Sequence, residues 1–112
     1  MSENTNLTGQ VKIADEVIAS IASTAVLESD GVAGLGGLND LTGRLRGKAA
    51  KKGVSLTTDG QNVQITVGIT VKSGVKIQDV ALDVQQKVKT AIETMTGFTA
   101  IEVNVQVVGL VA

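Results

Sequence analysis

Apolar residues recur at helical spacing in two parts of the chain. Behind an acidic pair, apolar positions repeat every three or four residues, which predicts an amphipathic helix over residues 15–28. A second and cleaner stripe runs from Ile77 to Met95. Gly97 follows it, at the place where a left-handed helix cap is expected. The pattern therefore predicts two helices, each with one apolar face to bury.

Strict alternation of apolar and polar residues predicts a sheet with one buried face. Residues 63–71 place five aliphatic side chains on one side and mainly polar groups on the other. The turn dipeptide Asp59-Gly60 separates this run from a shorter one at 54–57, and the two runs predict an antiparallel hairpin. Other short runs predict strands over residues 10–13, 32–35 and 101–107.

These elements predict an α+β fold in the order β-α-(β)-β-β-α-β. Two amphipathic helices need an apolar surface to cover, and the sheet offers one, so we expect a two-layer sandwich. Its sheet should be mostly antiparallel, with both helices on one face. A chain of 112 residues has room for one core only. We therefore expect residues 9–112 to form a single domain behind a disordered N-terminal tail, residues 1–8.

Several residue types that form catalytic, metal-binding or disulfide sites are absent from the sequence. The chain has no Cys, His, Trp, Tyr or Pro, so it can form no disulfide, no usual zinc site and no Ser-His-Asp triad. We therefore expect no enzymatic activity, no cofactor and no metal. The start of the chain is polar and no apolar run approaches the roughly 20 residues needed to cross a bilayer. These features predict a cytoplasmic protein without direct membrane insertion.

Charge is balanced overall but uneven along the chain. The net charge is −1, yet residues 41–53 carry five bases and no acid, which leaves −6 on the rest. Six glycines fall between residues 31 and 52, so we interpret residues 36–53 as a flexible, Gly-rich basic loop. Such a loop either contacts an anion, such as nucleic acid, or keeps the chain soluble. The five bases are Arg44, Arg46, Lys48, Lys51 and Lys52.

Among the candidate sites in the sequence, an interaction surface is the one that remains. The run from Gly43 to Lys48 lacks the spacing and the following Ser or Thr of a phosphate loop. Asp79 and Asp83 share a helix face, but Asp83 stands four residues before Lys87, which is typical of a solvated ion pair. The chain ends in an uncharged apolar run. Within it, Val107 and Leu110 either complete the domain's own sheet or pair with a neighbour's edge.

Several blocks of the sequence resemble the alkaline shock protein family of Gram-positive bacteria. These blocks follow one another over about residues 8–110, and their order and spacing carry the resemblance. One departure is Ser73, because an aromatic residue often precedes the glycine in relatives. The matching blocks include GQVKIADEVI at 9–18, GVAGL at 31–35, VKSGVKI at 71–77, VQQKVK at 84–89, MTGF at 95–98 and VNV at 103–105.

The resemblance implies a cytoplasmic, non-enzymatic bacterial protein linked to alkaline or cell-envelope stress. Relatives in this family self-assemble or reach the membrane through a separate membrane-anchored partner. Our first hypothesis is therefore a stress-response protein that self-associates or docks on such a partner, placing it peripherally at the membrane. The alternative hypothesis is a small RNA-binding module that uses the basic loop, because helices on one sheet face also suit such modules.

Overall fold

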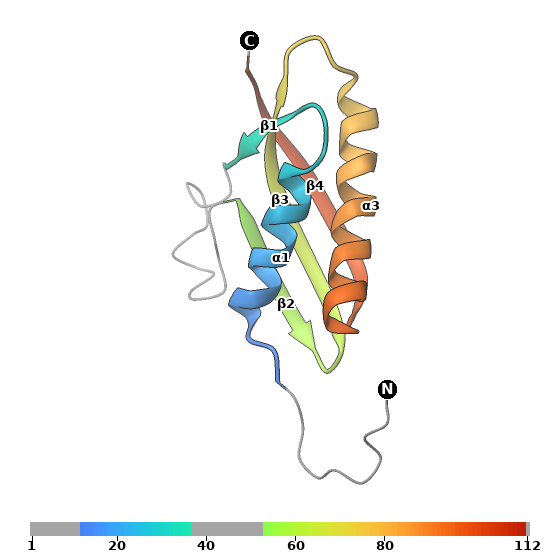
Figure 1. Ribbon diagram of the computed structural model, residues 1–112. Coiled ribbons are helices and arrows are strands. Elements are labelled where there is room, and N and C mark those ends of the chain that lie inside the picture. Colours follow the sequence, from blue (N-terminus) through green and yellow to red (C-terminus); the bar gives the residue numbers. More distant parts are fainter. Residues whose placement is uncertain (1–11, 37–52, 112) are drawn as a thin grey trace, which may run out of the picture.

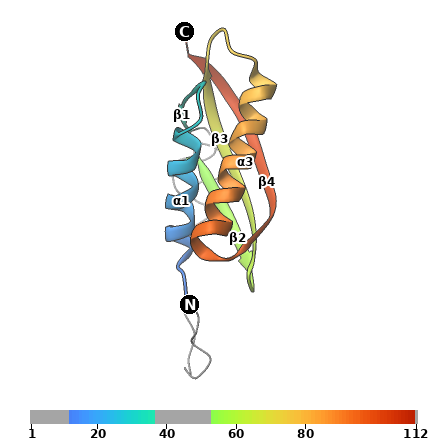
Figure 2. The same ribbon diagram turned by 45° about the vertical axis from the view of Figure 1, so that its right-hand side comes forward.

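Six elements make up the part of the chain that the computed structural model describes, residues 12–36 and 53–111. Both helices cover one face of a four-stranded sheet, so the predicted two-layer α+β class is confirmed (Figure 1; Figure 2). In chain order the elements are α1 (Asp15–Leu27), β1 (Val32–Leu35), β2 (Val54–Asp59), β3 (Asn62–Lys72), α3 (Ile77–Thr96) and β4 (Thr99–Val111).

The element bounds agree with the sequence prediction except at the first and the last expected strand. Lys12, Ile13 and Ala14 belong to no strand and lead directly into α1, so the minor strand expected over residues 10–13 is not found in its described part. Its remainder lies outside the described residues. The expected tail at 1–8 and residues 37–52 of the basic loop lie outside them as well. The last strand is longer than the alternation predicted, because β4 continues to Val111.

β3 is the central strand, and its two sides are used differently. On one side, β2 pairs with the first part of β3 and β1 with its end, both antiparallel. On the other side, β4 runs parallel to β3 along its whole length. A parallel neighbour requires a crossover, and α3 supplies it between β3 and β4. The sheet is thus mostly antiparallel in its number of pairings, with one long parallel pair.

β1 and β2 are two halves of one edge strand. Gly68 of β3 accepts a hydrogen bond from the Gly36 amide at 3.1 Å and donates one to the Gly53 carbonyl at 2.7 Å. Both groups of one residue point to the same side of a strand, so Gly36 and Gly53 meet at a single position on β3. Residues 37–52 are therefore inserted into the middle of this edge strand.

The core lies between the sheet and the two helices. The five aliphatic side chains of β3 at residues 63–71 are all buried, as their alternation predicted. α1 contributes mainly small residues to the core, whereas α3 buries Val80, Val84, Val88 and Ile92. The ends of the predicted α3 stripe differ, because Ile77 is exposed and Met95 is 68% exposed. Gly97 caps α3 in the left-handed conformation, as predicted.

Candidate interaction edge on β4

Charged side chains in residues 12–36 and 53–111 form two ion pairs along α3, Asp83–Lys87 and Lys89–Glu93. No group of three or more acidic residues there is placed to hold a metal ion. The predicted Asp83–Lys87 ion pair is present at 3.3 Å, and Asp79 takes no part in it. Neither described helix is long and apolar enough to cross a membrane.

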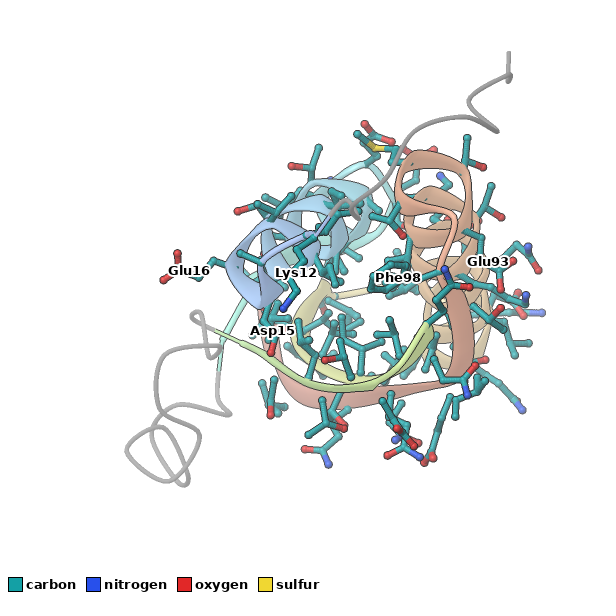
Figure 3. The ribbon with its side chains drawn as sticks, turned by 90° about the horizontal axis from the view of Figure 1, so that it is seen from below. Lys12, Asp15, Glu16, Glu93 and Phe98 are labelled. Carbon is teal, nitrogen blue, oxygen red and sulfur yellow. The ribbon has the colours of Figure 1, made fainter. Side chains whose placement is uncertain are left out.

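A hollow with a volume of about 670 Å³ lies at the lower end of the sandwich. Phe98 sits there between the helices and the sheet, with Lys12 beside it, while Glu16 points outward (Figure 3). Phe98 packs against the core. Among the residues that the structure describes, Lys12 is the one charged residue that lines the hollow.

The backbone of β4 shows which of its groups are free. Thr99 donates to the Gln61 carbonyl and Val111 accepts from the Ser73 amide, both at 2.8 Å, so these two residues face β3. By contrast, the Ala100 amide donates to Glu93 and the Val103 carbonyl accepts from Gln85. Glu93 and Gln85 belong to α3, which shows that Ala100 and Val103 face the outer edge of the sheet.

Two bulges set which later residues face that edge. The register with β3 skips Ile101 and again Val108, so each is an extra residue in β4. Successive residues of a strand alternate in direction, and each bulge shifts that alternation by one. The edge-facing residues after Val103 are therefore Val105, Val107 and Leu110. This assignment agrees with Val111, which faces β3.

α3 occupies the first half of this edge and leaves the second half open. Glu93 accepts the Ala100 amide at 3.1 Å and is held by Lys89 at 2.9 Å, and these bonds lower the pKa of Glu93. Gln85 donates to the Val103 carbonyl at 3.0 Å. We call residues 99–104 the guarded half.

The open half of the edge is residues 105–111. Within residues 12–36 and 53–111, no side chain is found bonded to the backbone of Val105, Val107 or Leu110. In Figure 1, β4 runs obliquely away from α3 as it approaches the C-terminus. An unpaired strand edge is a ready template for another strand.

The two apolar residues singled out from the sequence both lie on the open half, in different environments. Val107 is half-buried and packs against the core, so it helps to complete this domain's own sheet. Leu110 is 62% exposed, and Val108 and Val111 beside it are also exposed. Their binding role stays a prediction.

The sequence did not predict the other parts of the candidate site in this way. The five bases of the predicted loop lie outside the described residues, so no observation favours the RNA-binding alternative. Gln85 and Glu93 were missed, because only the tertiary packing of α3 brings them to β4. The Val107-Val108 doublet, which interrupts the alternation, is the one sequence signal of the second bulge.

Together these features define a class: a small two-layer α+β domain with a partly guarded strand edge. Within that class, the chain belongs to the family of alkaline shock protein 23, whose description is a cell envelope-related function. The family model matches residues 3–112, nearly the whole chain. The resemblance inferred from the sequence blocks is therefore confirmed.

Three bacterial proteins show the family relationship at the level of whole chains. YloU of Bacillus subtilis is 35% identical over 106 residues, covering 91% of this chain and 88% of its own. YqhY of the same organism is 39% identical over 111 residues, covering 96% and 81%. Spy1614 of Streptococcus pyogenes is 30% identical over 103 residues, covering 88% and 85%. All three are named as uncharacterized proteins.

Solved structures of similar fold include several variants of the MamM CTD. One superimposes with a TM-score of 0.54, covering 84% of this chain and 95% of its own, at 14% sequence identity. Another has a TM-score of 0.53 with the same identity. At this identity the likeness concerns the fold alone. It supports the two-layer arrangement of sheet and helices described above.

Proposed function

We propose that this chain is a non-enzymatic protein of cell-envelope homeostasis under alkaline stress. It acts by binding proteins, through self-association or through docking on a membrane-anchored partner. The observation that carries the proposal is the open half of the β4 edge, residues 105–111, with its unpaired backbone groups. Membership in a family with a cell envelope-related function supports the biological setting.

The exposed side chains of the open half support a protein partner. Val108, Leu110 and Val111 are adjacent apolar residues at the end of an edge strand, and all three are exposed. A partner strand that pairs with this edge gains main-chain hydrogen bonds and covers these side chains. The composition supports a role without catalysis, because the chain has no His or Cys. A cytoplasmic protein held at the membrane by its partner fits these features.

The test compares two exposed leucines in cells and in solution. Leu110→Lys places a charge on the open half, whereas Leu27→Lys places one on α1, where Leu27 is 56% exposed. We expect the unmodified chain to co-sediment with membranes or to form assemblies by light scattering. Leu110→Lys should lose most of this association, and Leu27→Lys should keep it. A strictly monomeric chain that never leaves the soluble fraction would contradict the proposal.

A further inference from the structure

The β4 edge discriminates between partners because α3 lies over its guarded half. Gln85 and Glu93 reach from α3 to the edge-facing groups of Val103 and Ala100. Exposed Leu82 of α3 lines a hollow of about 430 Å³ together with Ile101 of the first bulge. Anything that pairs with the guarded half must therefore fit beneath this helix.

The distances between paired strands and between packed helices exclude a second copy of this chain from most of the β4 edge. Paired strands lie about 4.8 Å apart, whereas packed helices need about 8–10 Å between their axes. A second copy aligned along the whole of β4 would bring its own α3 too close to this one. Two copies could therefore share only the open half, residues 105–111, which spans about 23 Å at about 3.3 Å per residue.

We propose that the β4 edge binds a single extended segment of a partner protein, one that carries no helix over it. Such a segment can pair with both halves of the edge, so it gains more hydrogen bonds than a second copy can. This inference rests on the proposed function, since it names the kind of partner that docks there. It also requires Gln85 to release the Val103 carbonyl and Glu93 to release the Ala100 amide where the segment pairs with the guarded half.

The side chains on the two faces of β4 specify the chemistry of that segment. On the helix side lie the half-buried Val103 and Val105 and the exposed Leu82, all apolar. On the open side, Glu102 and Asn104 are exposed and joined by a hydrogen bond of 2.9 Å. The partner segment should therefore alternate apolar residues with neutral polar or basic ones. An acidic residue beside Glu102 would be repelled.

β3 pairs with the opposite side of β4 and already has this alternation of apolar and polar side chains. Its aliphatic residues point toward the helices, and Gln64, Thr66 and Lys72 alternate with them. A synthetic peptide with the sequence of residues 62–72 is therefore a suitable probe. A second peptide of the same composition, ordered so that the alternation is lost, is its control.

The experiment titrates each labelled peptide with the full chain and follows fluorescence anisotropy. We expect saturable binding of the alternating peptide only. Val107→Pro removes an edge-facing amide without removing a hydrogen bond to β3, so binding should fall at least about tenfold. Val107→Thr keeps the amide and should therefore bind the peptide more tightly than Val107→Pro does. Circular dichroism checks that each variant is folded.

Gln85→Ala provides a second measurement that does not depend on proline. It frees the Val103 carbonyl from its internal donor, so the alternating peptide should bind about three- to tenfold more tightly. Glu28→Ala, on the exposed turn after α1, is the matched control and should leave the affinity unchanged.

Several outcomes overturn the inference. Absence of peptide binding, equal binding of the two peptides, or full binding by folded Val107→Pro would each do so. A dimer that Val107→Pro dissociates, with no peptide bound, would identify a second copy as the occupant instead. If the peptide fails while the chain still associates with membranes, only this inference falls. If the peptide binds but the chain stays monomeric and soluble in cells, the proposed function falls.

Discussion

Gly53 stands where the two halves of the edge strand meet, and its surroundings leave no space for a side chain. A Cβ atom at this position would lie 2.6 Å from the Gly36 amide nitrogen and 3.0 Å from the Gly68 carbonyl oxygen. Its backbone also has φ of +77°. Both neighbours are backbone atoms within the sheet, so neither can move without disturbing hydrogen bonds to β3.

Replacing Gly53 and Gly60 by alanine should separate packing from backbone strain. Gly60 has a similar φ of +63°, but no atom lies within 4 Å of a Cβ built there. Gly60→Ala should therefore lower the free energy of unfolding by about 1 kcal/mol, the cost of a left-handed alanine. Gly53→Ala should cost at least about 2 kcal/mol more, because overpacking adds to that strain. Urea unfolding measures both, and equal losses would contradict the packing assignment.

The sequence distinguishes these two glycines only in part. Asp59-Gly60 is recognisable as a tight turn from the dipeptide itself, because local geometry demands it. The need for glycine at Gly53 arises from Gly36 and Gly68, which are distant in sequence and meet it only in the folded sheet. Residue-scale constraints of this second kind cannot be derived from local pattern.

At the scale of elements, a short polar network ties the end of α1 to the middle of α3. Buried Ser29, 4% exposed, donates to Asp83 at 2.8 Å, and Lys87 pairs with the same carboxylate. Lys87 also donates to the Glu28 carbonyl at 3.4 Å, where α1 ends. A cation at a helix C-terminus is favourable because of the helix dipole. The hydrogen bond from Ser29, and then those from Lys87, lower the pKa of Asp83.

Ser29→Ala should reduce stability in a pH-dependent way. Because the folded-state pKa of Asp83 lies below its unfolded value of about 3.9, its contribution is present above about pH 4 and is lost as pH falls further. We expect Ser29→Ala to lower the free energy of unfolding by about 1 kcal/mol at pH 7. The difference from the unmodified chain should be smaller at pH 3. Urea unfolding at the two pH values measures this change.

Ser23→Ala is the matched control for this network. Ser23 bonds to the Ala19 carbonyl of its own helix at 2.9 Å and contacts no carboxylate in the described residues. Its substitution should therefore have the same effect at both pH values. A pH-independent loss in Ser29→Ala, equal to that of the control, would show that Asp83 does not depend on Ser29.

The hydrophobic pattern predicted which segments form helices and strands, but it did not predict which strands pair with one another. The 3.6-residue period identified α1 and α3, and the two-residue period identified β2 and β3, because each has one face that must be buried. The same alternation in β4 shows which face is buried but not which strand lies beside it. Its parallel pairing with β3, its bulges and its guarded half depend on where α3 packs, so they were not predictable from β4 alone.

For the molecule as a whole, the continuous edge strand predicts that residues 37–53 can be removed. Leu35 pairs with Ile69 and Val54 with Val67, so a direct Gly36–Val54 link would keep both pairings on either side of Gly68. The shortened chain should unfold within about 1 kcal/mol of the full chain, because loop-closure entropy changes slowly with length. Circular dichroism and urea unfolding test this expectation. Loss of the folded state would show that β1 and β2 need the inserted segment.

The parallel pairing of β4 also determines when the binding edge comes into existence during synthesis. β4 follows the other five described elements in the chain, and it can join β3 only after α3 has crossed the sheet. Until then β3 has one unsatisfied side and the core lacks Val103 and Val105. A chain in which β4 has not yet been synthesised therefore cannot present this edge. A partner that recognises the edge would distinguish molecules whose sheet is complete from those that still lack β4.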